Sequence, residues 1–314
     1  MKPTADRKGL NLSRQYRKMY KSRYLFLFLL PGIVYYIIFR YIPIYGVIIA
    51  FKNYNVFDGI VNSPWAANNG FEHFIDLFQS NAFYRIFKNT LILSFMQIIF
   101  TFPMPIILAL CLNEVKSGTW SGFVKTTSYM PHFISTVVIC GIVFNFLSSN
   151  GIANKILGAF GKEKIQFLLM PQYFRGIYVA TEIWQKMGWD SIIFTAALAG
   201  VDESLYEAAY IDGASRLQKI IYIDFPSIIP TAVILLIFNI GNVMNMGFEK
   251  VLLLYNPNTY ETADVIGTYV YRRGIAGTDF SFSTAVGLFQ SVIGFILVII
   301  ANKTADKLSD ISLW

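Results

Sequence analysis

The stretch SLYEAAYIDGASRLQKIIYIDFPSIIP, residues 204–230, places charged and polar side chains between two long apolar segments. Ser204, followed three residues later by Glu207, has the pattern of a capping box, which predicts that a short helix begins at Ser204. Gly213 predicts the end of that helix, because glycine adopts the positive φ that a tight reversal of the chain requires.

The second half of this stretch predicts another helical element. Apolar side chains recur at helical spacing over residues 214–222, which indicates a second short amphipathic helix. Pro226 and Pro230 then predict the first turn of a further helix, where proline is tolerated. The resulting helix–turn–helix segment is too polar to lie in lipid, so we expect it at a membrane surface.

The composition indicates an integral membrane protein. The chain has 314 residues, of which 55% are hydrophobic and only 14% are charged, against about 25% charged in soluble proteins. About 20 apolar residues cross the roughly 30 Å of a bilayer core. Segments of this kind are expected at residues 25–48, 90–112, 129–148, 175–199, 227–248 and 281–301. They are continuous rather than alternating, so the predicted fold is an all-α polytopic bundle of about six transmembrane helices and not a β-barrel.

The positive charge is concentrated at the N-terminus. The formal net charge is +7, and eight lysines and arginines precede Tyr24 against a single acidic residue, Asp6. A basic flank before the first span favours a cytoplasmic N-terminus and binding to anionic lipid headgroups rather than to nucleic acid. The predicted organisation is a basic cytoplasmic tail (1–24), a transmembrane domain (25–301) with a cytoplasmic loop at 200–226, and a cytoplasmic C-terminal tail (302–314).

The segments between the predicted spans divide between the two membrane faces. We expect loops at 52–85, 149–174 and 249–280 outside, with an interfacial helix over 264–271, and a link at 113–128 inside. Arg40 interrupts the first apolar segment. Either the helix continues and this side chain reaches toward the interface, or a second short interfacial segment follows; the second arrangement is favoured.

Residues for catalysis are scarce in this sequence. The two histidines, His73 and His132, and the two cysteines, Cys111 and Cys140, do not have the spacing of metal ligands, and no phosphate-binding loop of the GxxxxGK[ST] type is present. The prediction is therefore no catalytic residue, no metal and no cofactor in this chain. The hypothesis of a membrane-embedded enzyme is therefore disfavoured.

Polar side chains instead interrupt the two apolar segments on either side of the opening stretch. Helical spacing predicts one shared face for each group, and polar groups at this depth face a bundle interior or a wet cavity. Carboxamides beside tryptophans suit a neutral polyhydroxylated ligand, whereas hydrogen bonding between helices is the alternative. The candidate substrate-pathway residues are Glu182, Gln185, Lys186 and Trp189 before the stretch, and Asn239, Asn242 and Asn245 after it. Glu182 and Lys186, at i and i+4, can offset each other's charge.

The opening stretch resembles the EAA loop of binding-protein-dependent ABC importer permeases, in which EAA is followed at fixed spacing by glycine, isoleucine and Leu-Pro. Phe225 stands where the family usually has leucine. The resemblance extends over nearly the whole chain, including NTLILS, PHFIS and IWQKMGWDSIIF. Within this family, the chain is similar to the carbohydrate-uptake group, which is related to the larger maltose permease. The positions that match or lie within the loop are Glu207, Ala208, Ala209, Asp212, Gly213, Ala214, Ile223 and Pro226.

This resemblance implies a permease of the bacterial cytoplasmic membrane that imports an oligosaccharide by alternating access. Its EAA loop would dock on an ABC ATPase dimer, where ATP and Mg would bind. A second permease subunit, an extracytoplasmic solute-binding protein and the carbohydrate would be its other partners. In the maltose system the sugar is held by the helices that flank the loop, which implies the same location for the pathway residues here.

Three other functions are weighed against this one. An ion-coupled secondary carrier would use Glu182 and Lys186 as relay groups, an ABC permease could carry a solute other than a sugar, and a purely structural membrane subunit would transport nothing. A secondary carrier has no use for a loop that docks on an ATPase.

Overall fold

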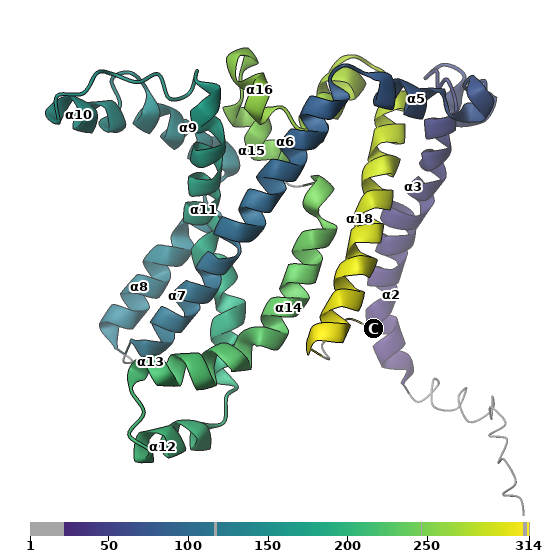
Figure 1. Ribbon diagram of the computed structural model, residues 1–314. Coiled ribbons are helices and arrows are strands. Elements are labelled where there is room, and N and C mark those ends of the chain that lie inside the picture. Colours follow the sequence, from purple (N-terminus) through teal and green to yellow (C-terminus); the bar gives the residue numbers. More distant parts are fainter. Residues whose placement is uncertain (1–21, 116–117, 246, 310–312, 314) are drawn as a thin grey trace, which may run out of the picture.

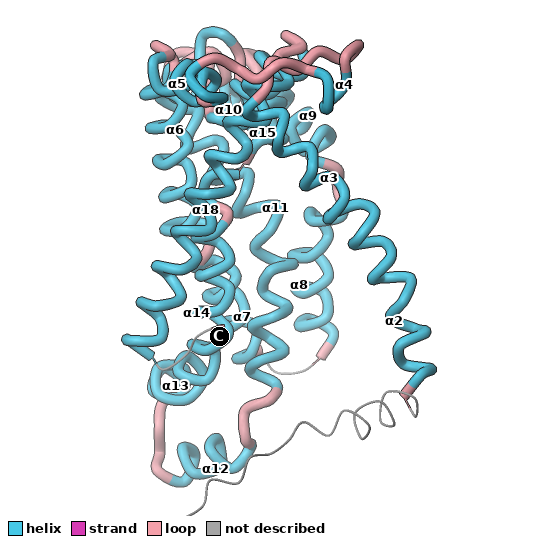
Figure 2. Tube along the Cα trace, turned by 90° about the vertical axis from the view of Figure 1, so that its right-hand side faces the viewer, coloured by secondary structure: helices cyan, strands magenta, loops and turns pink. Residues whose placement is uncertain are grey.

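The computed structural model describes residues 22–115, 118–245, 247–309 and 313, and these are helical nearly throughout (Figures 1 and 2). Within these ranges β pairing is limited to one isolated bridge between Lys52 and Trp65. The basic tail proposed for residues 1–24 lies outside the described residues up to position 21, as do 310–312 and 314 of the proposed C-terminal tail.

Long helical segments make up the bundle, and several of them contain π or 3-10 turns. In chain order they are α2 (Arg23–Tyr36) with Ile37–Tyr41, α3 (Ile42–Ile44) and Tyr45–Phe51; α6 (Phe83–Met96) with Gln97–Thr101 and α7 (Pro103–Glu114); α8 (Thr119–Tyr129) with Met130–Phe133 and α9 (Thr136–Leu147); α11 (Pro171–Ala199); α13 (Arg216–Lys219) with Ile220–Asp224 and α14 (Phe225–Gly241); and α18 (Phe280–Ser309). The predicted all-α membrane bundle with about six spans is confirmed.

Length and hydropathy identify five helical segments of the described chain as able to cross a membrane: Arg23–Phe51, Phe83–Glu114, Thr136–Ala159, Arg216–Gly241 and Phe280–Lys307. The remaining expected span corresponds to α11, whose 29 residues extend about 43 Å at 1.5 Å per residue. Its Tyr178 and Phe194 are almost fully buried. A helix that is surrounded by other helices can be more polar than one that faces lipid.

The short elements lie at two opposite ends of the bundle (Figure 1). The segments predicted as outer loops gather at or near one end, which we call the α10 end. They form α4 (Gly59–Asn62), α5 (Glu72–Gln79), α10 (Ile152–Ala159), α15 (Phe248–Leu254), α16 (Tyr260–Ala263) and α17 (Ile266–Val270). At the other end, the α12 end, α12 (Glu203–Ile211) hangs below the bundle on two loops (Figure 2).

The first span is continuous through Arg40, because the chain passes through a π turn at Ile37–Tyr41 without leaving the helix. The favoured second interfacial segment after Arg40 is therefore wrong. The π turn keeps the backbone hydrogen-bonded where Arg40 interrupts the apolar sequence, and the Arg40 side chain is exposed.

The third span differs from its predicted position at 129–148. A helix begins earlier, at Thr119, so the predicted link over 113–128 is largely helical, and the chain leaves the α-helix between α8 and α9. Pro131 lies at this break, and Ser135 caps the new helix by accepting a hydrogen bond from the Val138 amide. The sequence of α8, TWSGFVKTTSY, is too polar for a hydropathy pattern to reveal it as part of a span.

The segment after Gly213 also differs from the prediction. Ser215 and Gln218 form the capping box there, and the helix that begins at Arg216 continues through a π turn into α14. Pro226 therefore lies within a continuous helix and does not begin a new one. At the far end α14 stops at Gly241, short of the predicted position 248, and a 3-10 turn precedes α15.

The N-cap of α12 lies two residues earlier than predicted, at Asp202 instead of Ser204. Asp202 accepts the hydrogen bond from the Ser204 amide at 3.0 Å, so the predicted capping box of Ser204 and Glu207 is wrong. The hydrogen bond from the Ser204 amide lowers the pKa of Asp202.

The predicted end of α12 is confirmed. Gly213 has φ of +71°, its amide donates to the Tyr210 carbonyl and the Ala214 amide donates to the Ala209 carbonyl. These are the two hydrogen bonds of a Schellman motif, which requires a left-handed residue at this position.

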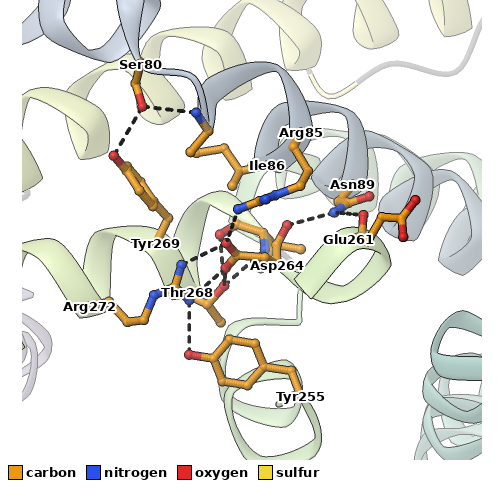
Figure 3. Close-up of polar contacts among 12 residues, drawn as sticks. Ser80, Arg85, Ile86, Asn89, Tyr255, Glu261, Asp264, Thr268, Tyr269 and Arg272 are labelled. Atoms are coloured by element: carbon orange, nitrogen blue, oxygen red, sulfur yellow. Dashed lines mark hydrogen bonds and ion pairs between the residues drawn. The ribbon is translucent and has the colours of Figure 1, made fainter. Parts of the chain in front are cut away.

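A polar cluster holds the α10 end together (Figure 3). A helix, α17, covers Ile266–Val270 of the segment predicted as an interfacial helix, and Asp264 before it is fully buried. The Arg272 guanidinium binds both Asp264 carboxylate oxygens at 2.8 and 2.7 Å, and Thr268 donates to one of them. From α6, Asn89 donates to the Asp264 carbonyl. The loop segments and the bundle are thereby joined.

Candidate functional site

A cavity of about 530 Å³ lies in the middle of the bundle. It is lined by the second span, α11, α14 and the turn before α15. Its lining residues are Gln97, Ile98, Thr101, Phe102, Pro105, Glu182, Lys186, Asp190, Ile193, Phe194, Leu235, Phe238, Asn239, Asn242, Asn245 and Gly247. Carboxamide, hydroxyl and charged groups therefore share this space with apolar side chains, which is the usual composition of a small-molecule site.

An ion triad lies beside the cavity, and two of its members, Glu182 and Lys186, line it. Glu182 on α11 contacts Lys186 Nζ through Oε2 at 2.6 Å, as the i,i+4 spacing predicted, and Lys250 Nζ of α15 through Oε1 at 2.5 Å. The side chains of Glu182 and Lys250 are 5% and 4% exposed, whereas that of Lys186 is 47% exposed and lines the cavity. Pairing of this kind is what permits charges in a bundle interior.

The three predicted asparagines all line the cavity, from α14 and the turn that follows it. The Asn239 amide donates to the Leu235 carbonyl at 3.0 Å, and the Asn242 amide donates to the Phe238 carbonyl at 3.0 Å. In the described part of the chain these hydrogen bonds stay within one helix, so they do not supply the helix-to-helix hydrogen bonds of the alternative interpretation. Asn245 also lines two smaller cavities, of about 300 and 220 Å³.

Gln185 and Trp189 are not among the residues that line the cavity, and both contact the break of the third span. Gln185 donates to the Ile134 carbonyl at 3.4 Å, and the Trp189 ring stacks on His132 with centroids 4.5 Å apart. The four α11 residues share one broad face, as their spacing predicts, but of these only Glu182 and Lys186 line the cavity. At 100° per residue, Gln185 lies about 100° around the helix from Lys186, enough to face the break of the third span instead.

The sequence prediction missed four polar residues at this site. Asp190 follows Lys186 by four residues and could have been found by extending the same helical spacing. Gln97 and Thr101 also stand four apart in an otherwise apolar segment, and Gln97 donates to the Tyr178 hydroxyl. Lys250 carried no comparable signal, because it was expected in an outer loop and its partner is 68 positions away.

The second candidate site is the exposed segment at the α12 end. The residues of the EAA pattern are exposed on α12 and the turn after it, except that Ala209 and Ile223 are partly buried; Pro226 is exposed on α14. Glu207, Ala208, Asp212, Gly213 and Ala214 thus present polar and small side chains on a helix that projects away from the bundle (Figure 1). This arrangement is suited to contact with another protein.

A multi-span helical bundle with a polar central cavity and one projecting helix defines a membrane transport protein. Residues 80–309 match the family of binding-protein-dependent transport system inner membrane components, and the chain belongs to that family.

Its similarity to individual proteins covers nearly the whole chain. It is 43% identical to the polygalacturonan/rhamnogalacturonan transport system permease protein YteP of Bacillus subtilis (strain 168), over 93% of this chain and 91% of that protein. It is also 43% identical to the protein LplB of the same organism, over 91% and 90%.

Solved structures resemble the chain equally closely. A crystal structure of a bacterial ABC transporter involved in the import of the acidic polysaccharide alginate contains a chain 42% identical, with a TM-score of 0.85, covering 94% of this chain and 99% of that one. A crystal structure of a bacterial alginate ABC transporter in complex with an alginate pentasaccharide-bound periplasmic protein matches with a TM-score of 0.86, at 42% identity over 96% and 100%.

Proposed function

We propose that this chain is the membrane-spanning permease subunit of an ATP-driven importer that moves oligosaccharides, such as fragments of polysaccharides, into the cell. The observation that carries the proposal is the coexistence of a polar central cavity and a projecting EAA helix in one chain of this family. The names of the relatives, which include transport systems for polygalacturonan and alginate, support a saccharide substrate.

In this proposal the α12 end is cytoplasmic and the α10 end faces outward. Helix α12 docks on an ABC ATPase, and ATP with Mg binds to that partner while this chain holds no cofactor. A second permease subunit completes the pathway. The alginate importer crystallised with a periplasmic binding protein supports an extracytoplasmic solute-binding protein as the partner at the α10 end.

Transport proceeds by alternating access around the central cavity. Binding of ATP draws together the α12 helices of two permeases and opens the cavity outward, and hydrolysis resets it. Asn239, Asn242 and Asn245 offer amide donors and acceptors to sugar hydroxyls, and Lys186 offers an ammonium group. Gln185 and Trp189 support the break in the third span and so shape the cavity from outside.

The secondary-carrier alternative is disfavoured by the ion triad. That alternative uses Glu182 and Lys186 as relay groups, but these two side chains contact each other and Lys250 contacts the second oxygen of Glu182, so this carboxylate is held as an ion pair. A relay would also leave the exposed EAA segment without a role.

The test is uptake by proteoliposomes that contain the complete transporter, with uronic-acid and neutral oligosaccharides presented on its solute-binding protein. Asn239→Leu is expected to lower uptake about ten-fold, because it removes hydrogen bonds to the sugar worth about 1–2 kcal/mol. Asn239→Gln keeps an amide and serves as the matched control, with a smaller loss expected. Unchanged uptake by Asn239→Leu would assign this residue to helix packing.

A further inference from the structure

Among the described residues, the side chain of Tyr206 connects helix α12 to the bundle. No side chain of α12 is buried. Within the described residues, a single hydrogen bond leads from an α12 side chain to the rest of the molecule: the Tyr206 hydroxyl donates to Asp224 Oδ1 at 2.7 Å. Tyr206 is the residue immediately before Glu207 of the EAA pattern.

The acceptor of this hydrogen bond joins two long helices. Asp224 is fully buried in the π turn that leads directly into α14. Its Oδ1 atom also accepts a hydrogen bond at 3.2 Å from Asn113 Nδ2, at the end of α7. One carboxylate oxygen therefore connects α12, α7 and α14.

Lys219 lies next to this contact between Tyr206, Asp224 and Asn113, which we call the joint. Its ammonium group forms an ion pair with Glu114 of α7 and lies 5.2 Å from the centre of the Tyr206 ring. The same group is 4.0 Å from Asp224 Oδ2, an oxygen that is buried without a hydrogen-bond partner. A short movement of Lys219 would bring it from a long ion pair to a hydrogen bond with that oxygen.

Both helices at this joint continue to the central cavity. Pro105 of α7 and Asn239 of α14 line it. The covalent connections of α12 run to α11 and, through α13 and the π turn, to α14, and each passes a glycine, Gly200 or Gly213. The contact at Asp224 therefore links α12 to α7, to which it has no direct chain connection, and links it to α14 by a side-chain route that does not pass through Gly213.

We propose that Tyr206 and Asp224 are positioning residues that transmit movement of α12 to α7 and α14, and so couple an ATPase partner to the cavity. This inference rests on the proposed function, in which α12 docks on that partner. The Tyr206 hydroxyl supplies the connection, and the free oxygen of Asp224 gives Lys219 a second carboxylate to bind as the helices shift.

The first experiment measures the coupling ratio, which is the amount of oligosaccharide taken up per ATP hydrolysed by the complete transporter in proteoliposomes. Tyr206→Phe removes the hydroxyl and keeps the ring. We expect uptake to fall about five-fold, the effect of one lost hydrogen bond, while ATP hydrolysis stays within about two-fold of the unmodified transporter. Tyr222→Phe, an exposed tyrosine of the same π turn, is the matched control and should leave the ratio unchanged.

The second experiment follows the movement itself. Spin labels at Ser204→Cys and Arg216→Cys, in a chain whose two native cysteines are replaced by serine, report the distance between α12 and α13. The distance distribution should stay narrow with and without ATP when Tyr206 is present, and should broaden in the Tyr206→Phe chain. Asp224→Asn retains a carbonyl acceptor and should keep a narrower distribution than Asp224→Ala.

Two results would overturn the inference, and they differ from each other. If Tyr206→Phe leaves both the coupling ratio and the distance distribution unchanged, while a cysteine at Ala208 still cross-links to the ATPase, the transmission role is wrong and the proposed function stands. If the cysteine at Ala208 does not cross-link to the ATPase, the docking role of α12 is wrong, and this inference is overturned with it.

Discussion

Asp264 at the α10 end and Asp224 at the α12 end are both fully buried carboxylates, but their surroundings differ. Both oxygens of Asp264 bind a guanidinium group, and Thr268 donates to Oδ1 (Figure 3). One oxygen of Asp224 accepts two hydrogen bonds, while the other has no hydrogen-bond partner. Both oxygens of Asp264 therefore have hydrogen-bond partners, whereas only one oxygen of Asp224 has them.

The surroundings of Asp264 form a closed network. Arg85 of α6 adds an ion pair at 3.6 Å, and the Arg272 guanidinium also lies 4.7 Å from the centre of the Tyr260 ring. The hydrogen bonds to Asp264 raise the pKa of Arg272, so this guanidinium stays charged. Arg175 of α11 donates to Asn89 at 2.9 Å and extends the network to a third element.

This difference indicates different mechanical properties at the two ends. A fully satisfied buried network fixes one arrangement, because any movement leaves a charge without its partner. At Asp224, by contrast, Lys219 can move a short distance and form a hydrogen bond with the oxygen that has no partner, which gives this end a second arrangement of similar contacts. We interpret the α10 end as a rigid platform and the α12 end as a movable joint.

The largest expected effect comes from breaking the saturated network with Asp264→Ala. It should lower the free energy of unfolding by about 3 kcal/mol, at the low end of the range for a broken buried ion pair, because the Arg272 side chain is 30% exposed. The reporter is the temperature at which buried Cys140 reacts with a thiol-reactive dye in detergent, with exposed Cys111 replaced by serine.

The matched control is the ion pair of Asp279 and Arg273, whose side chains are 32% and 35% exposed. Asp279→Asn removes the charge but keeps an acceptor for the Phe282 amide. Its expected cost is below about 1 kcal/mol, as for other exposed pairs. Equal losses in the two variants would show that the Asp264 network does not hold the α10 end rigid.

A smaller loss of stability is expected from Asp224→Ala. This change removes two hydrogen bonds but also relieves an unpartnered buried oxygen, and Lys219 keeps its ion pair with Glu114. We expect a cost of about 1–2 kcal/mol in the same dye assay, together with a clear fall in oligosaccharide uptake. A shift as large as that of Asp264→Ala, with uptake retained, would reverse the assignment of the two ends.

The sequence predicted features that depend on local chemistry. The spans follow from apolar length, and the turn at Gly213 follows from the need for a left-handed residue after α12. The Glu182–Lys186 contact follows from helical spacing. Asp202 and Ser204 are both good caps two positions apart, so local preference alone did not decide between them.

Features that depend on packing between distant segments were not predictable in the same way. Nothing near Glu182 in the chain indicates that Lys250 binds its second oxygen. The π turns at Ile220–Asp224 and elsewhere rotate side chains relative to a regular helix, so periodicity misplaces the residues that follow. Tyr206 and Asp224 meet across 18 residues because the chain reverses between them, and neither stands out in the sequence.

The smallest expected effect concerns the titration of Tyr206. Burial and then the hydrogen bond to Asp224 raise the pKa of Tyr206 to about 12, from an ordinary value of about 10. Because the neutral phenol is the donor, its contribution to stability is complete below about pH 10 and is lost as the pH rises through about 12.

Tyrosinate absorbance, taken as the difference between the unmodified chain and Tyr206→Phe, measures this pKa directly. Since burial is the larger cause, Asp224→Asn should lower the pKa of Tyr206 only partway toward 10. The coupling ratio of the unmodified transporter should correspondingly stay constant from about pH 7 to about pH 9.5, where the hydroxyl keeps its proton. A pKa near 10 in the unmodified chain would mean that water surrounds the Tyr206 hydroxyl, and that α12 moves without the connection to Asp224 that makes this end a joint.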